Sequence, residues 1–440
     1  MASSFAESNC SNSTAFPSPQ PEKSLTLDEK EPPLSSRDVQ GGEGSGQREV
    51  DVEASTRSVP SVSSGSDDLD GGRIAWMTIA GCWLVQFCTI GYSNAFGVYQ
   101  DFYTREFLSN TSPSDISWIG SFQLFMQYAP GILVGHAFDA GYFRFMLVFG
   151  SFLEVFSLLM LSLAHREQYY QVFLAQAVGL GLGQGLLFIP SLAIIPRYFK
   201  KRRAFATGVA VTGASLGGII WPIVLNQISQ RTSFANAVRA TGGLAGVMLC
   251  CANILIRAGP PQRPRMEVAE ASRKGGMGNI LRDGAFMVSI AAACLVAFGL
   301  FFPYFYLQLY ALDKALSPDL AFYAIAILNA GSIVGRLLPN FFADRIGGYN
   351  LIVPCLLATS ILLFAMLGVN TSAGVVVFGL LYGCMSGSCT SIARAHYHLT
   401  IEQGLESTWV GLFGSFNYFE LGAYAYESPS DFGWGLHSPW

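Results

Sequence analysis

The residues best suited to do chemistry are charged side chains inside long apolar segments. Arg336 lies in the apolar stretch 319–341, and Glu154 lies in the middle of 143–164. A charged side chain in such a segment costs about 2.5–3.5 kcal/mol on membrane-insertion scales, so it is expected to face a cavity or a partner. The planar guanidinium of Arg336 suits a carboxylate, although snorkelling toward a helix end fits as well. Glu154 fits either a proton-binding site or a residue at the lipid edge.

Neutral polar side chains occupy the same apolar segments. Gln123 and Gln127 are four residues apart, so a helix places them on one face. That face fits a cavity wall and interhelical hydrogen bonding about equally well. Ser332 and Asn329 precede Arg336 by about one and two helical turns. We therefore expect one substrate-binding group that consists of Arg336, Asn329, Ser332, Asn94, Gln123, Gln127 and Tyr304.

Other kinds of chemistry find no support in the residue pattern. The sequence contains no recognisable phosphate-binding glycine loop, zinc-ligand spacing or Ser/His/Asp set. All cysteines except Cys10 lie in apolar runs, where they behave as small buried hydrophobic residues. The formal net charge of −4 argues against a nucleic-acid partner. We therefore expect no enzyme, no metal site and no cofactor.

The composition indicates that these side chains are held within a membrane. Of the 440 residues, 51% are hydrophobic and 13% are charged, and the mean hydropathy is +0.38. A soluble domain carries about 25% charged residues. Residues 1–70 are polar and contain no apolar stretch of signal-peptide length. We expect this segment to be a disordered cytosolic tail, because its few apolar groups cannot offset the entropy of ordering.

The rest of the chain contains ten apolar segments of the length that a bilayer requires. About 20 residues of helix cross the hydrocarbon core, and each spanning segment must satisfy its own backbone hydrogen bonds. We therefore predict an all-α integral membrane protein with its lipid bilayer as partner. The predicted spans are 75–96, 115–137, 143–164, 168–192, 204–226, 236–256, 285–308, 319–341, 349–368 and 373–393.

A basic, proline-containing stretch separates six spans from four. The expected organisation is an N-terminal six-helix half at 71–256, a cytosolic central loop at 257–284, an incomplete C-terminal half at 285–407 and an atypical tail at 408–440. The last part contains a partial apolar segment interrupted by Asn417 and Glu420.

Lysine and arginine are distributed unequally between the two sets of loops. Because positively charged loops stay in the cytosol, the bias predicts that the N-terminus and the central loop are cytosolic. Thirteen basic residues lie on that side, namely Arg144, Arg197, Lys200 to Arg203, six within 257–284 and Arg345, against Arg105, Arg166, Arg231 and Lys314 on the other.

Two short segments recur at matching positions in the two halves. Residues 135–144 (GHAFDAGYFR) follow the second span, and residues 340–347 (NFFADRIG) follow the eighth. Both resemble the inner-loop motif Gly-xxx-Asp-xx-Gly-Arg of the major facilitator superfamily. The resemblance implies a helical bundle in two halves that works by alternating access. It also implies an inner gate formed by charged pairs between the halves, with Asp139, Arg144, Asp344 and Arg345 as members.

A narrower resemblance concerns the entries to three spans. Residues 70–76 (DGGRIAW), 117–121 (SWIGS) and 198–208 (YFKKRRAFATG) are similar to fungal members of the monocarboxylate porter family. This similarity implies a small organic solute, with a coupled proton as a further partner. Animal members carry a lysine at the position of Val98, an aspartate at the position of Ser332 and an arginine at the position of Arg336. Of these three charged residues, this chain retains only the arginine.

We expect a multi-pass transporter in the plasma membrane for a monocarboxylate-like anion, a vitamin or a secondary metabolite. Two alternatives remain, a nutrient sensor built on a transporter fold and a truncated product without transport. The second alternative arises because twelve spans are usual in the superfamily. Only 46 residues follow Arg394, so we expect ten to eleven spans.

Overall fold

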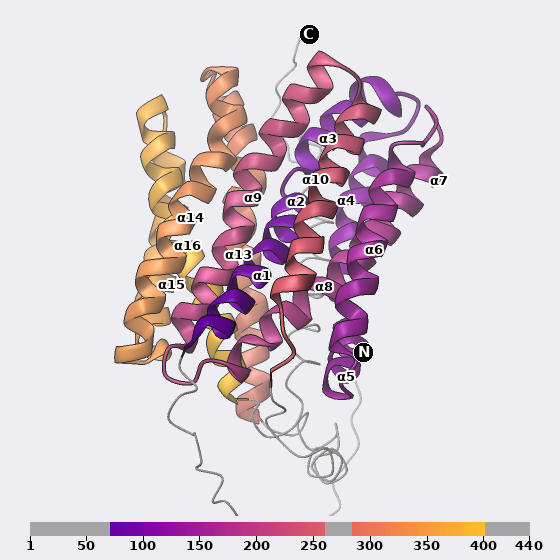
Figure 1. The fold of residues 1–440 in the computed structure, drawn as a ribbon. Coiled ribbons are helices and arrows are strands. Elements are labelled where there is room, and N and C mark those ends of the chain that lie inside the picture. Colours follow the sequence, from indigo (N-terminus) through magenta and orange to yellow (C-terminus); the bar gives the residue numbers. More distant parts are fainter. Residues whose placement is uncertain (1–70, 260–283, 401–440) are drawn as a thin grey trace, which may run out of the picture. The chain divides into compact units, whose positions relative to one another are not determined.

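The computed structural model describes residues 71–259 and 284–400, and the ordered elements within these ranges are helices (Figure 1). This confirms the prediction of an all-helical chain. The expectations for the tail 1–70, most of the central loop and the segment 408–440 lie outside the described residues.

The first half consists of six helical passes. They are α1 (Arg73–Cys88), α2 (Ile90–Ser93) and α3 (Phe96–Phe102) with the π-helical turn Tyr103–Phe107; α4 (Pro113–Tyr128) and α5 (Gly131–Asp139); α6 (Phe143–Leu161); α7 (Tyr169–Val172), the π-helical segment Phe173–Leu180, α8 (Gly181–Ala193) and the 3₁₀ turn Ile195–Arg197; α9 (Arg203–Arg231); and α10 (Phe234–Leu255).

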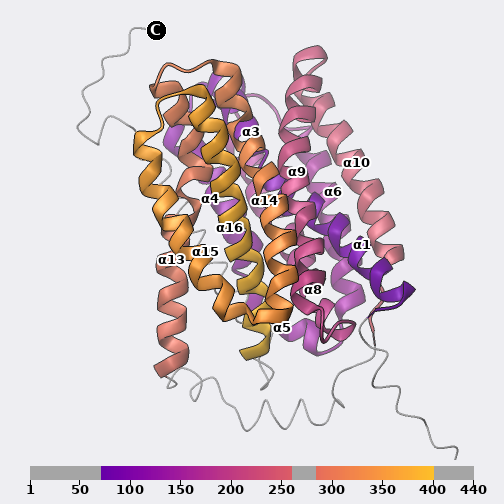
Figure 2. The same ribbon diagram turned by 90° about the vertical axis from the view of Figure 1, so that its left-hand side faces the viewer.

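The described part of the second half adds four passes. They are α13 (Gly284–Asp313), α14 (Pro318–Ile346), α15 (Gly348–Ala365) with the 3₁₀ turn Met366–Gly368, and α16 (Ser372–Thr400). Figure 2 brings these four helices to the front, with α9 beside α14.

The ten passes lie at the positions of the ten predicted spans. Eight helical stretches in the described ranges have the length and hydropathy needed to cross a bilayer. The other two predicted spans correspond to α13 and to the pair α4 and α5. The second span is not one continuous helix, because Pro130 has no N–H group to continue the hydrogen-bond ladder.

The first pass is longer and less regular than the predicted span 75–96. It continues to Phe107 and is interrupted at Thr89 and at Asn94. The Thr89 hydroxyl donates to the Val85 carbonyl at 2.8 Å, and the Ser93 hydroxyl lies 3.3 Å from the Thr89 carbonyl. Such bonds from Ser and Thr bend helices. The bend brings the segment 93–105 into the interior between the halves.

Hydrogen bonds between loops show that successive passes alternate in direction. At one end, the Arg144 guanidinium donates to the Ile256 carbonyl at 3.0 Å. At the other end, the Arg166 guanidinium donates to the Glu106 carbonyl at 2.6 Å. We call the end that holds Arg144 and Ile256 the basic end, and the other the distal end.

The repeated glycines let helices touch through their backbones. A Cβ on Gly335 of α14 would collide with the Cys384 carbonyl of α16, and a Cβ on Gly213 of α9 would collide with the Trp83 carbonyl of α1. Small residues of this kind let membrane helices approach closely. These glycines therefore serve helix packing.

Apolar side chains cover the outer faces of several helices. Phe152 on α6 is 62% exposed, and Phe364 on α15 is 75% exposed. Exposed apolar surface of this extent is typical of a protein that contacts lipid. The core of the first half is one continuous cluster of buried side chains, whereas that of the described second half is divided into small clusters.

Candidate substrate-binding cavity

A cavity of about 630 Å³ lies between the two halves. Both halves supply its walls, through the bent first pass and α4 on one side and through α13, α14 and α16 on the other. Its polar lining consists of Ser93, Asn94, Gln100, Asp101, Thr104, Arg105, Ser121, Gln123, Gln127, Tyr128, Tyr304, Gln308, Asn329, Arg336 and Thr390. Six of the seven residues predicted to bind substrate are in this set.

A buried network of carboxamides forms the wall on the first half. The Gln123 Nε2 donates to the Gln184 Oε1 of α8 at 3.2 Å, and the Ser93 hydroxyl donates to the same oxygen at 2.9 Å. The Ser93 hydroxyl also lies 3.3 Å from the Gln127 Oε1. Gln123 and Gln127 therefore both line the cavity and join helices, which combines the two alternatives considered for this pair.

Gln123 and Gln127 of this wall each have one polar side-chain atom without a hydrogen-bond partner in the described part of the chain. Within the described part of the chain, the Gln123 Oε1 and the Gln127 Nε2 are buried and have no hydrogen-bond partner. One is an acceptor and the other a donor. An unsatisfied buried polar group costs about 1–3 kcal/mol, so a ligand that offers a hydroxyl and a carbonyl would be stabilised here.

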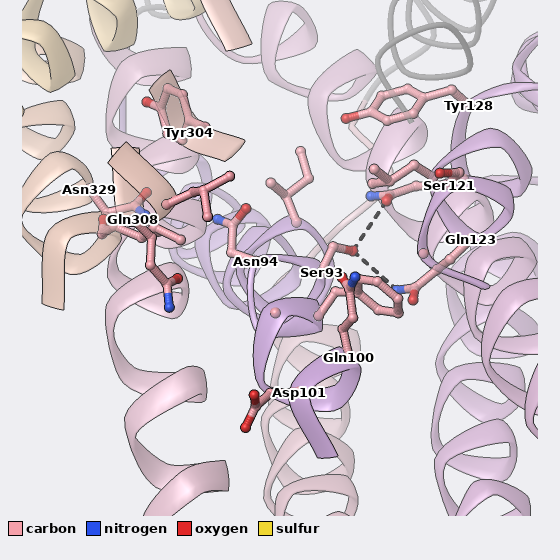
Figure 3. Close-up of a pocket in the computed structure, with 18 of the residues that line it drawn as sticks. Ser93, Asn94, Gln100, Asp101, Ser121, Gln123, Tyr128, Tyr304, Gln308 and Asn329 are labelled. Carbon is pink, nitrogen blue, oxygen red and sulfur yellow. Dashed lines mark hydrogen bonds between the residues drawn. The ribbon is translucent and has the colours of Figure 1, made fainter. Parts of the chain in front are cut away.

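The opposite wall carries Tyr304, Gln308 and Asn329, which face Ser93 and Gln123 across the cavity (Figure 3). Asn94 lies between the two walls. A Cβ on Gly218 of α9 would lie 2.6 Å from the Asn94 Nδ2 and 3.0 Å from the Asn329 Nδ2. The absent side chain of Gly218 thus lets an amide from each half lie close to α9.

Arg336 lies toward the basic end of the cavity and is 8% exposed. Its Nη1 donates to the Val211 carbonyl of α9 at 2.6 Å, so the side chain crosses from α14 to the first half. The guanidinium therefore lies in the interior, which speaks against the snorkelling alternative. Arg336 belongs to the cavity lining, as does the cation Arg105.

Ser332 does not lie where the sequence predicts. Its hydroxyl packs against Gly387 of α16, where a Cβ would come within 2.5 Å, and the residue is fully buried outside the cavity lining. It shares a helix face with Arg336, but that face lies over both α16 and the cavity. The short serine stays in the helix contact, whereas the long arginine reaches past it.

The distal part of the cavity contains residues that the sequence analysis did not select. Asp101 and Arg105 form an ion pair of 2.7 Å between exposed side chains, and Gln100 and Thr104 accompany them in the lining. The predicted first span ends at residue 96, which puts residues 100–105 in a loop. Their spacing of four residues is the signal that the helix continues.

Asp344 joins the two halves at the basic end. Its two carboxylate oxygens accept hydrogen bonds from the backbone N–H groups of Ala204 and Phe205, each at 2.9 Å. These amides are among the orphan donors of the first turn of α9. A carboxylate is favoured there by the helix dipole.

Arg144 and Arg345, two of the other predicted gate residues, have described contacts within their own halves. Arg144 donates to the Ile256 carbonyl within its own half. Arg345 lies 4.6 Å from the ring centre of Phe341 on its own helix. Asp139 ends α5, and its side chain is not among those described. Asp344 thus forms hydrogen bonds between the halves, in which its carboxylate accepts from the backbone N–H groups of Ala204 and Phe205 at the start of α9.

Glu154 is buried inside the first half and contributes nothing to the cavity lining. Its exposure is 0%, which rules out the lipid-edge alternative. Among the residues that the structure describes, no group of three His, Cys, Asp or Glu side chains could hold a metal ion.

The chain is similar to known proteins in both sequence and fold. Residues 82–419 match the family model of the Major Facilitator Superfamily. The aspyridones efflux protein apdF of Emericella nidulans is 41% identical over 328 residues, which is 74% of this chain and 65% of that protein. The agnestins efflux protein AgnL12 of Paecilomyces divaricatus is 37% identical over 320 residues, or 72% of each chain. The fujikurins efflux protein of Gibberella fujikuroi is 34% identical over 328 residues, or 74% of this chain and 69% of that one.

Solved structures show the same fold. The proton:xylose symporter XylE superimposes with a TM-score of 0.60 at 13% identity, over 80% of this chain and 86% of that one. FucP in the outward conformation gives a TM-score of 0.59 at 13% identity, over 79% and 89%. These proteins are transporters rather than enzymes, as the sequence analysis expects. The chain spans 65% of the length of the aspyridones efflux protein.

Proposed function

The chain belongs to the Major Facilitator Superfamily, and from this premise we propose that it is a secondary active transporter that exports a small organic metabolite by alternating access. The observation that carries the proposal is the cavity between the halves, with the unpartnered Gln123 Oε1 and Gln127 Nε2 in its wall. Export rather than uptake is supported by the three fungal relatives, which are efflux proteins.

The lining supports a particular class of substrate. Six carboxamides, namely Asn94, Gln100, Gln123, Gln127, Gln308 and Asn329, offer donors and acceptors side by side. Phe96, Tyr128 and Tyr304 add aromatic surface. A secondary metabolite with several hydroxyl and carbonyl groups on an apolar frame is complementary to such a lining.

Arg336 adds a preference for a negative charge. Its guanidinium would bind an acidic oxygen of the substrate, in the manner that the monocarboxylate porter resemblance implies. The substrate we propose is therefore a weakly acidic secondary metabolite. Simple monocarboxylates would use the arginine but leave most of the carboxamides without partners.

The proposed orientation places the basic end in the cytosol of a cell whose plasma membrane holds the protein. The distribution of Lys and Arg supports this orientation. The cavity lining includes the exposed Asp101 and Arg105 near the distal end, while Asp344 bonds to α9 at the basic end. This arrangement supports the proposal of an outward-facing state, in which Asp344 would close the cytosolic side.

Transport by the purified full chain in liposomes tests the proposal. Aspyridones, agnestins and fujikurins, the compounds named for the relatives, are loaded inside, and their release is followed by mass spectrometry. We expect at least one of these compounds to be released faster than it is from loaded liposomes that contain no protein. Gln123→Ala should slow this release several-fold, because the substrate loses one hydrogen bond worth about 0.5–1.5 kcal/mol.

Gln168→Ala is the matched control, because it removes an exposed carboxamide from the start of α7. Its release rate should equal that of the unchanged chain. Binding of these compounds without release would favour the sensor alternative. If no compound in the panel is either bound or released, the proposed function is contradicted.

A further inference from the structure

Glu154 is a carboxyl group in a place that provides no partner for a negative charge. Its residue is 0% exposed, and neither carboxyl oxygen has a hydrogen-bond partner in the described part of the chain. Directly opposite, a Cβ on Gly183 of α8 would lie 2.8 Å from the Glu154 backbone nitrogen, so the two helices leave no room beside it. An ionised carboxylate in such a site is strongly disfavoured, so the folded protein holds Glu154 with a proton.

The groups that face Glu154 are neutral. They are the Cys88 thiol of α1, the Tyr92 hydroxyl of α2 and the Gln184 amide of α8. The cation contributed by α10, Arg239, donates to Ser162 at the end of α6, about 12 Å further along the helix axis. No described cation on these helices is therefore bonded to the carboxyl.

A row of buried hydroxyls leads away from this site. The Tyr92 hydroxyl bonds to the Tyr99 hydroxyl and lies 3.1 Å from the Thr241 hydroxyl. Tyr103 follows one turn later, with its ring centre 6.0 Å from that of Tyr99. The three tyrosines are at most 2% exposed and are absent from the cavity lining. They form a polar route that is separate from the proposed substrate path.

The route ends between two π-helical segments near the distal end. The Tyr103 hydroxyl, in the turn Tyr103–Phe107, donates to the Gln176 Oε1 of the segment Phe173–Leu180 at 2.6 Å. π-Helical turns interrupt the regular hydrogen-bond ladder and occur frequently at functional sites. Two such segments bonded to each other at this point supply a place where the helices can loosen and admit a proton.

A second contact connects Glu154 with the substrate cavity. The Gln184 amide that faces Glu154 accepts hydrogen bonds from Ser93 and Gln123, which both line the cavity. A substrate that engages Gln123 changes the bonds available to Gln184. Occupation of the cavity and the charge of Glu154 are thereby linked through a single amide.

We propose that Glu154 is a proton-binding site that couples transport to proton movement, and that the tyrosine row conducts the proton to it from the distal end. The inference rests on the proposed transport function. In one cycle the carboxylate of Glu154 takes up one proton from the distal side and becomes a neutral acid. It releases the same proton toward the basic end after the halves rearrange. The proton is carried unchanged, and no group is oxidised or reduced.

Infrared spectroscopy of the purified full chain tests the proton site without any substrate. The carboxylic C=O stretch of Glu154 should be present at neutral pH and be missing in Glu154→Gln. Glu106→Gln is the matched control, since Glu106 is exposed in the π-helical turn. The control should keep the band. A neutral-pH spectrum of Glu154→Gln identical to that of the unchanged chain would overturn the proton site.

Transport in liposomes tests the coupling, with aspyridones as the probe. Glu154→Gln should still exchange aspyridone across the membrane. Its accumulation of aspyridone driven by a pH gradient should fall at least ten-fold. Tyr99→Phe should slow accumulation while leaving exchange unchanged. Glu154→Asp should restore part of the accumulation, which a purely structural role would not produce.

The possible failures are distinguishable. If Glu154→Gln accumulates aspyridone at the rate of the unchanged chain, the coupling proposal is wrong. If the unchanged chain does not move any panel compound, the proposed function is wrong, and the infrared measurement alone decides the proton site. A melting temperature of Glu154→Gln equal to that of the unchanged chain shows that a loss of accumulation is not a loss of folding.

Discussion

The carboxylate of Asp344 lies 2.9 Å from the backbone nitrogen of Ala204, so a residue of α14 caps the first turn of α9 across the boundary between the halves. The sequence analysis expects this aspartate to take part in a gate made of charged pairs. The observed partner is the helix terminus itself. A terminus provides positive partial charge without a side chain, so the bond does not depend on which residue follows Arg203.

Asp344→Asn should favour the state that is open at the basic end. Loss of a capping carboxylate costs about 0.5–2 kcal/mol, which converts to a shift of about 2- to 30-fold in the ratio of the two states at 1.4 kcal/mol per factor of ten. Spin-label distances between α9 and α14 at the basic end should lengthen. Asp319→Asn, at the exposed distal start of α14, is the control and should leave these distances unchanged.

Arg336→Lys should weaken the release of acidic substrates about ten-fold, and Arg336→Ala should abolish it. The ammonium group of lysine cannot form a bidentate pair with an acidic oxygen, and a charge-assisted hydrogen bond contributes about 1.5–3 kcal/mol. Radiolabelled aromatic carboxylic acids in liposomes provide the measurement. Lys314→Ala removes an exposed cation that lies over Tyr310 and should not alter the flux. Unchanged acid flux in Arg336→Ala at equal protein abundance would exclude the proposed role.

Gly335→Ala should destabilise the protein because the added methyl would occupy the position of the Cys384 carbonyl on α16. Overpacking of this kind costs about 1–3 kcal/mol, so the melting temperature in detergent should fall. Gly243→Ala on α10 adds the same methyl where no heavy atom lies within 4 Å. The control should melt at or above the temperature of the unchanged chain. Equal melting of both variants would show that the α14–α16 contact can relax.

Membrane-impermeant maleimide applied to intact cells tests the proposed orientation. In a background without reactive cysteines, Asp313→Cys at the distal end should be labelled, and Lys201→Cys at the basic end should be labelled only after the cells are opened. The expectation follows from the excess of Lys and Arg at the basic end. Labelling of Lys201→Cys from outside would reverse the orientation.

The positions of the spans follow from the sequence because about 20 apolar residues in a bilayer can satisfy their backbone only as a helix. Gln123 and Gln127 were predictable for a related reason, since helical spacing places them on one face. The continuation of the first pass to Phe107 was not, because it contains the charged residues Asp101 and Arg105. Their charges end an apolar run without ending the helix.

The position of Ser332 shows a second limit of predicting the site from the sequence. Spacing along α14 indicates that Ser332 and Arg336 share a face, but only packing decides that α16 covers the former. The partner of Asp344 illustrates the same limit across 140 positions of sequence. Contacts between distant helices depend on how the helices are arranged, and one sequence contains no direct signal for this.

The contact between α9 and α14 includes two glycines, Gly208 against the backbone of Arg336 and Gly218 against Asn329. At these two positions, rotation of one half against the other does not require a large side chain to move out of a packed position between the helices. The hydrogen bonds of Asp344 and the one from Arg336 to Val211 cross this contact, and the rings of Phe205 and Phe341 meet there at 5.9 Å between centres. The temperature dependence of turnover should accordingly report the strength of these bonds, and variants that remove them should work with a shallower Arrhenius slope.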